Sequence, residues 1–105
     1  MKFSNSVLPE SLVKFLQGKC GRDRECKGKL LIEMFNKVNI DEQKLIECRT
    51  NERLFQGFYI PIEIKVRIYD IQLKILWKYD KRIPQKQIFT YIFQEYLAQH
   101  NDTNS

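Results

Sequence analysis

Apolar residues occupy every second position between residues 60 and 68. The apolar members of this run are Ile60, Ile62, Ile64, Val66 and Ile68, and the charged residues between them are Glu63, Lys65 and Arg67. Because successive side chains of a β-strand point to opposite faces, the spacing predicts a strand with one aliphatic and one charged face. The aliphatic face must be covered by other elements, and the charged face stays open to solvent.

The pattern becomes helical after this predicted strand. Asp70 suits the N-cap of a helix over about 71–79, whose apolar side consists of Ile71, Ile75, Leu76 and Tyr79. Pro84 suits the first turn of a second helix ending near Ala98. The apolar stripe of this second helix consists of Ile88, Phe89, Ile92, Phe93, Tyr96 and Leu97. Residues 99–105 are polar and are predicted to form a frayed tail.

The N-terminal third shows the same order of elements. Residues 2–8 are a candidate strand, a helix opens at Pro9, and a second helix is predicted from about Glu25 to Val38. The apolar pairs of this second helix recur 58 residues later, and the apolar positions of the first helix recur about 60 residues later. We interpret the recurrence as an internal duplication of a strand–helix–helix unit. Between the units, Asp41 is expected to cap a short helix, and residues 54–59 are expected to add a strand.

Chain length and charge narrow the class of protein. With 105 residues and 43% hydrophobic content, the chain suits one compact domain. We divide it into a first unit (1–40), a linker (41–59), a second unit (60–98) and the tail (99–105). Neither a bilayer-spanning run of about 18 apolar residues nor a signal-peptide core is visible, so an intracellular protein without a membrane partner is expected. The net charge is +5, which favours an anionic partner such as nucleic acid.

The cysteines and the single histidine do not indicate a disulfide framework or a zinc site. Cys20, Cys26 and Cys48 make an odd count, which argues against a disulfide framework, and Cys20 and Cys26 have no nearby histidine pair for a zinc site. Free or buried thiols are therefore expected, with a Cys20–Cys26 bond left open for a hyperthermophilic source. Because no nucleophile–base pair, glycine-rich phosphate loop or metal cluster is visible, we expect no enzymatic activity, no cofactor, no metal site and no small-molecule substrate.

The succession of strand, capped helix, turn and second helix resembles the ribbon-helix-helix family of DNA-binding proteins, the Arc- and MetJ-like regulators. The residues that carry the resemblance are 64–68, Leu73, Leu76, Tyr79 and 83–97. With the weaker match over residues 8–31, the chain is similar to tandem ribbon-helix-helix transcription regulators of filamentous archaeal viruses. The resemblance implies a mostly α fold with a small antiparallel β-ribbon, in which one chain forms an intramolecular pseudo-dimer.

This resemblance also implies a function. A sequence-specific transcription regulator, for instance a viral repressor in the host cytoplasm, would insert the ribbon into the major groove of double-stranded DNA, and self-association on DNA is left open. The expected base readers of the second unit are Glu63, Lys65 and Arg67, and those of the first unit are Ser4, Asn5 and Ser6. Two registers stay open for the first strand. Either Leu8 faces the core and Phe3, Asn5 and Val7 face the DNA, or a one-residue slip turns Lys2, Ser4 and Ser6 outward.

The N-terminus of each second helix is expected to hold a DNA phosphate. The implied residues are Gln85 and Lys86 in the second unit and Lys27 and Gly28 in the first. The turns before these helices, 82–84 and 24–26, lack the glycine and the Ser, Thr or Asn cap that the family usually has there. An alternative function is a plasmid-partition or antitoxin-type adaptor, which binds DNA through the same fold and also binds a protein partner.

Overall fold

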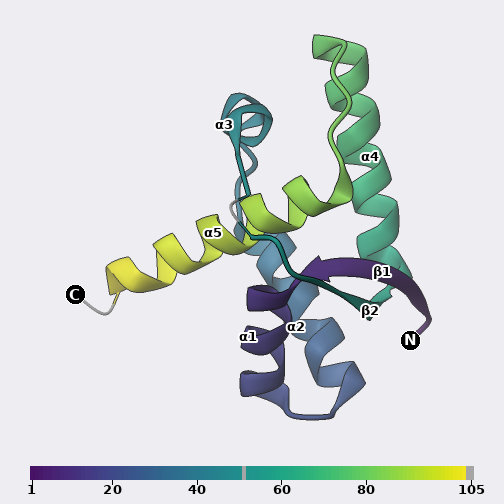
Figure 1. Cartoon of the computed structure of the whole chain (residues 1–105), viewed down its shortest axis with the longest axis vertical. Helices are drawn as coiled ribbons and strands as arrows, with labels where there is room; N and C mark the ends of the chain where they lie inside the picture. Colours follow the sequence, from purple (N-terminus) through teal and green to yellow (C-terminus); the bar gives the residue numbers. More distant parts are fainter. Residues whose placement is uncertain (51, 104–105) are drawn as a thin grey trace.

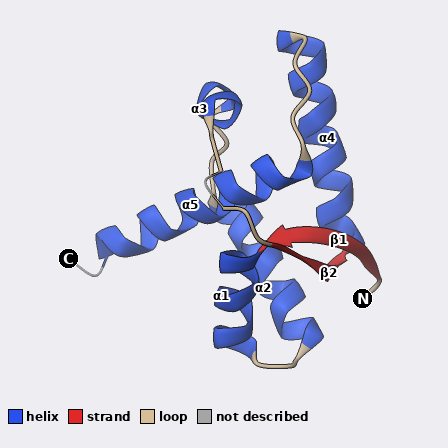
Figure 2. Ribbon diagram, viewed as in Figure 1, coloured by secondary structure: helices blue, strands red, loops and turns tan. Residues whose placement is uncertain are grey.

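The computed structural model describes residues 1–50 and 52–103, and the side chains of residues 1–50 and 52–99. The described elements follow one another as β1 (Phe3–Pro9), α1 (Glu10–Cys20), α2 (Arg24–Lys37), α3 (Glu42–Glu47), β2 (Phe55–Pro61), α4 (Ile62–Tyr79) and α5 (Gln85–Thr103). The predicted combination of a mostly helical fold and a small antiparallel ribbon is confirmed (Figure 2). None of the described helices is long and apolar enough to cross a membrane.

The ribbon joins two segments that are far apart in the sequence. Strands β1 and β2 pair antiparallel, from Phe3 opposite Pro61 at one end to Pro9 opposite Phe55 at the other. Figure 1 shows the ribbon crossing between the α1–α2 hairpin and the start of α4. Each strand leads directly into a helix, so the ribbon fixes where α1 and α4 begin.

The strand expected over residues 54–59 is confirmed as β2, but the strand predicted over residues 60–68 is wrong beyond Pro61. Strand β2 ends at Pro61, and Glu63, Lys65 and Arg67 lie on α4, in whose interior Asp70 lies as well. The alternation of apolar residues led to a wrong prediction because Ile64 and Ile68 are four positions apart, a spacing that fits both a strand face and a helix face. Proline ends the ladder and starts the helix, since it has no N–H for a strand partner and its φ suits a helix N-terminus.

The two strand–helix junctions have the same local geometry. Pro9 has φ −57° and ψ 140°, and Pro61 has φ −57° and ψ 142°. Strands start at residues 3 and 55 and the following helices at 10 and 62, so this part recurs with an offset of 52 instead of the predicted 60. Three pairs with this offset are buried to 1% exposure or less, namely Leu8 with Ile60, Leu12 with Ile64, and Leu16 with Ile68. The same inward positions are therefore apolar in both strand–helix segments.

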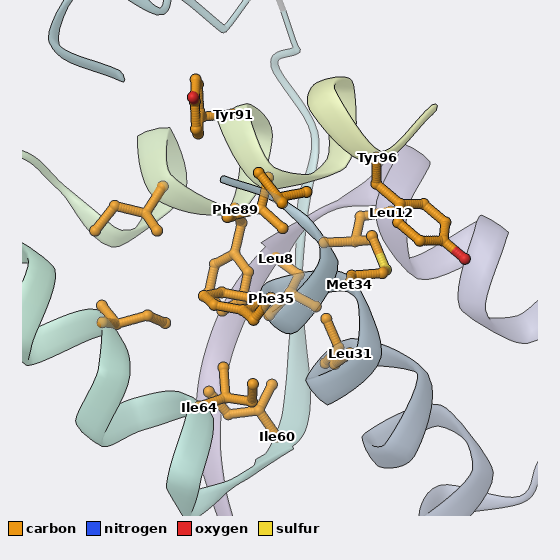
Figure 3. Packing of buried hydrophobic residues seen from close by; sticks show 14 of the residues in the cluster. Leu8, Leu12, Leu31, Met34, Phe35, Ile60, Ile64, Phe89, Tyr91 and Tyr96 are labelled. Atoms are coloured by element: carbon orange, nitrogen blue, oxygen red, sulfur yellow. The ribbon is translucent and has the colours of Figure 1, made fainter. Parts of the chain in front are cut away.

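One core serves both halves of the chain (Figure 3). The rings of Phe35 on α2 and Phe89 on α5 pack edge to face, with their centroids 6.0 Å apart. Leu8 and Ile60 close this core from the inner face of the ribbon, and both have no exposed surface. Because each half supplies one strand and half of the core, neither half buries its apolar side chains without the other.

The linker and the chain end also have defined structure. Helix α3 lies in the 41–59 segment, where the Asp41 carboxylate accepts hydrogen bonds from the backbone N–H groups of Gln43 and Lys44. It is held on α5 by Gln87, whose amide donates to the Leu45 carbonyl at 2.7 Å. Helix α5 continues to Thr103, past the expected end near residue 98, and residues 104–105 of the expected tail lie outside the described residues.

The expectation of free thiols is wrong for Cys20 and Cys26, which form a disulfide, the one bond that was left open. It joins the last residue of α1 to the first turn of α2 across a short turn. Cys48 is free and half-buried, and burial raises the pKa of its thiol. The raised pKa favours the thiol form of Cys48 over the nucleophilic thiolate.

Candidate nucleic-acid interface

The pairing of β1 with β2 decides which strand residues face away from the core. Directly opposed residues of an antiparallel ribbon share a face. The inner face contains Ser4, Ser6, Leu8, Phe58 and Ile60, and the outer face contains Phe3, Asn5, Val7, Phe55, Gly57 and Tyr59. The structure therefore has the register in which Leu8 faces the core.

The centre of the outer face is neutral and open to solvent. Asn5 lies opposite Tyr59, and Val7 lies opposite Gly57. All four are exposed, with exposed fractions of 43% for Val7 and 49% for Tyr59. The outer face thus offers an amide, a phenol hydroxyl and two methyl groups, and Gly57 leaves space beside them.

Basic side chains border the ribbon at both ends. The Arg24 guanidinium lies 4.6 Å from the centroid of the Tyr59 ring, near the Phe3 end. At the other end, the Lys86 ammonium lies 4.5 Å from the centroid of the Phe55 ring. Lys27, which was expected to bind phosphate, is half-buried, and its ammonium lies 5.4 Å from the ring of the inner-face residue Phe58. Positive charge therefore flanks a neutral outer face, and aromatic rings of the ribbon hold the cations in place.

The charged residues expected to read bases are not on the ribbon. Lys65 approaches it from α4, where its ammonium donates to the Asn5 carbonyl at 2.9 Å. Arg67 points toward the end of α2, donating to the Asn36 side-chain oxygen at 2.6 Å and to the Phe35 carbonyl at 2.9 Å. Glu63 is exposed in the first turn of α4. Arg67 thus satisfies a carbonyl at a helix C-terminus, a stabilising position for a cation.

The two serines expected to read bases lie on the inner face. Ser6 is 7% exposed, and its hydroxyl donates to the Gln85 side-chain oxygen at 2.9 Å. Ser4 is half-buried beside it in the same strand. Among the expected base readers of the first unit, Asn5 is therefore the one on the outer face.

The two helix N-termini that were expected to bind phosphate differ. At α2, the Asp23 carboxylate already accepts from the Cys26 N–H at 3.1 Å, and Glu25 adds a second negative charge. At α5, the first helical hydrogen bonds run from the N–H groups of Gln87 and Ile88 to the Pro84 carbonyl. The N–H groups of Gln85 and Lys86 come before these bonds and have no acceptor within the helix. The α5 N-terminus suits an anion better, because its positive end carries no acidic cap.

Gly28 has a packing function at the end of the ribbon. A β-carbon at this buried position would lie 2.9 Å from Pro61 Cγ, 3.2 Å from Met1 Sδ and 3.3 Å from Phe3 Cε1. Glycine lets α2 approach the strands this closely, and the approach brings Lys27 and Arg24 to the ribbon.

Sequence reasoning missed Tyr59, Gly57 and Arg24 as members of this surface, whereas Val7 was among the outward residues of one of the two registers considered for the first strand. The available signal was the proline that follows an inward aliphatic residue at both junctions, Leu8-Pro9 and Ile60-Pro61. Proline is confined to strand ends and edges, so aligning the two prolines places β2 before residue 62 and turns Tyr59 outward.

The described side chains bring together a neutral ribbon face, flanking cations and one open helix N-terminus. Within the described residues, no group of three or more His, Cys, Asp or Glu side chains is arranged to hold a metal ion. Comparison with known proteins finds no matching family model, no similar curated protein and no similar solved structure.

Proposed function

We propose that the chain is a sequence-specific DNA-binding regulator of transcription that inserts the β1–β2 ribbon into the major groove. The observation that carries the proposal is the exposed, uncharged outer face of a two-stranded ribbon with cations at both ends. In this proposal the two strand–helix–helix segments form a tandem ribbon-helix-helix pseudo-dimer. Their offset of 52 residues and matching proline junctions support it.

The dimensions of the ribbon suit the major groove. Paired strands lie about 4.8 Å apart, and a two-stranded ribbon fits a groove about 12 Å wide. The outer face presents Asn5 and Tyr59 to base edges. The inner face, with Leu8 and Ile60 buried, rests on the helices.

Backbone phosphates would be contacted on both sides of the inserted ribbon. On one side, Lys86 and the open N–H groups of α5 supply donors for a phosphate. On the other side, Arg24 supplies charge without an open helix N-terminus, since Asp23 caps α2. The proposal therefore includes two unequal half-sites instead of a perfect palindrome.

The outer face favours A·T base pairs. An asparagine amide pairs bidentately with adenine N6 and N7, and apolar groups contact the thymine methyl. Asn5 and Val7 present these two groups on the same strand, two positions apart. Bidentate recognition of guanine requires Arg or Lys, and no outer-face residue of either strand is charged. Arg24 reaches this face from α2 at the Phe3 end, away from Val7.

Selection of bound duplexes from a random pool at near-physiological salt tests the proposal. We expect a short motif with an A·T-rich centre and two unequal flanks. Recovery of a G·C-centred motif would retain DNA binding but overturn the assignment of Asn5 and Val7. Binding without a motif, lost as salt rises, would reduce the surface to nonspecific charge and overturn sequence-specific regulation.

A further inference from the structure

Exposed apolar side chains are concentrated on helix α4. The large hydrophobic residues exposed on this helix are Ile62, Val66, Tyr69, Leu73, Leu76 and Trp77. Leu73 is 63% exposed and Trp77 is 93% exposed. Leu73 and Leu76 are also among the residues that carry the resemblance to the ribbon-helix-helix family, and both are exposed. The opposite side of α4 is buried through Ile64, Ile68 and Ile75. The helix therefore has two apolar sides, and the described residues cover one of them.

The exposed side has the spacing of a coiled-coil seam. Five of its residues, Ile62, Val66, Tyr69, Leu73 and Leu76, follow one another at intervals of four, three, four and three, and we call them the α4 seam. This alternation is the 3.5-residue period of a and d positions, which packs one helix against another with knobs in holes. Val66 and Leu73 occupy a positions, and the other three occupy d positions.

We propose that two copies of this chain associate through their α4 seams, with the two helices packed in parallel. Charges beside the seam argue for this partner and this orientation. Lys65 occupies a g position, and Asp70 occupies the e position five residues later. In a parallel pair these positions face each other across the interface, so Lys65 of one copy lies near Asp70 of the other, twice by symmetry. The Lys65 ammonium donates one hydrogen bond to the Asn5 carbonyl of its own chain and has further N–H donors for Asp70 of the other copy.

The antiparallel arrangement has worse electrostatics. Centred on Tyr69, it brings Asp70 of one copy to Asp70 of the other, and like charges at such positions are unfavourable. A parallel pair also places equivalent seam residues at the same level, Leu73 against Leu73 and Leu76 against Leu76. Self-association in parallel thus satisfies both the apolar spacing and the flanking charges of the seam.

Space for a second helix is available along α4. Figure 1 shows the C-terminal half of α4 projecting away from the α1–α2 hairpin, with the connecting segment 80–84 running back beside it. Between this segment and the helix lies a groove lined by Tyr69, Leu73, Leu76 and Arg82, which widens the apolar surface next to the seam. Trp77 extends the surface at the far end.

Sedimentation velocity of the full chain without DNA tests the proposal, over concentrations up to several hundred micromolar. We expect a concentration-dependent shift from the 12.7 kDa monomer to a dimer, and its loss in Leu73→Asp. Leu54→Asp is the matched control, because Leu54 is 64% exposed but lies outside α4. Far-UV circular dichroism checks that both variants fold. A wild type that stays monomeric, or a Leu73→Asp variant that dimerises like Leu54→Asp, would overturn the proposal.

Cross-linking tests the orientation, in a Cys48→Ser background that removes the free thiol. A parallel seam brings position 73 of both copies together, so Leu73→Cys should form a disulfide-linked dimer on mild oxidation. If instead Ile62→Cys cross-links to Leu76→Cys when the two variants are mixed, the helices are antiparallel and the parallel arrangement is wrong.

Discussion

At the scale of single residues, Asn5 and Ser6 show how neighbouring side chains of one strand acquire different functions. Asn5 is exposed on the outer face, whereas Ser6 is buried and donates to Gln85 at the start of α5. Period-two geometry alone separates them, since adjacent strand residues face opposite ways. In our proposal Asn5 meets the DNA, and Ser6 positions the helix that holds a phosphate.

We expect Asn5→Ala to weaken binding to the selected DNA site by about 1–3 kcal/mol, the value of one bidentate base contact. The loss should be largest at one A·T pair, which duplexes substituted at that pair will identify. Ser4→Ala is the control, because Ser4 lies on the inner face. Equal losses for Ser4→Ala and Asn5→Ala in fluorescence anisotropy would mean that the register does not define the reading face.

Gly28→Ala should destabilise the fold by about 1–3 kcal/mol, because its β-carbon would overlap with Pro61 at the end of the ribbon. Gly18→Ala is the matched control, since it lies within α1 and its β-carbon meets nothing within 4 Å. Alanine there should stabilise the helix by up to about 1 kcal/mol. Urea unfolding measures both, and a Gly28→Ala variant as stable as Gly18→Ala would refute the close approach of α2 to the ribbon.

Arg67→Ala should lower the free energy of unfolding by about 1 kcal/mol, through loss of the hydrogen bonds to Asn36 and to the Phe35 carbonyl. It should leave the sequence preference for DNA unchanged, because Arg67 points to the end of α2. Repeating the duplex selection with this variant checks the second expectation. A changed motif would restore Arg67 as a base reader.

At the scale of elements, the sequence predicted both strands of the ribbon and the second helix of each unit, but it replaced the first part of α4 with a strand. The apolar stripes of α2 and α5 are long enough to show the helical period, so both helices were predicted within a few residues of their observed starts. The strand expected over 54–59 matches β2, whereas the strand expected over 60–68 is mostly the start of α4, because its alternation contains the helix spacing of Ile64, Ile68 and Ile75. The register of β1 could not be predicted, since it depends on pairing with a strand 52 residues away.

Because the α5 N-terminus suits an anion better than the α2 N-terminus, we predict how a substitution at α5 changes the salt dependence of DNA affinity. Lys86→Ala should weaken binding to all DNA sequences about equally and reduce the salt dependence by about one phosphate contact. Lys37→Ala is the control. Lys37 lies at the C-terminal end of α2 instead of at a helix N-terminus, and its ammonium pairs with the Glu33 carboxylate at 3.1 Å. Anisotropy titrations at several salt concentrations measure the slope. An unchanged slope for Lys86→Ala would place the α5 N-terminus outside the DNA contact.

At the scale of the whole molecule, the fold brings the two halves of the chain together at one ribbon and one core. The ribbon needs a strand from each half, and the contact between Phe35 and Phe89 joins their second helices. The ribbon face and the α4 seam use different residues, so DNA binding and self-association can be removed separately. In our proposals one chain supplies a complete DNA-reading unit, and the second copy adds a further unit without completing the first.

The most direct test of the central claim is a nitrogen-15 NMR titration of the full chain with a selected duplex. We predict that the largest amide shifts fall on residues 3–7 and 55–59 and at Gln85 and Lys86, with the central part of α4 little affected. Shifts concentrated on residues 63–73 of α4, with the ribbon unchanged, would contradict the ribbon as the DNA-binding surface.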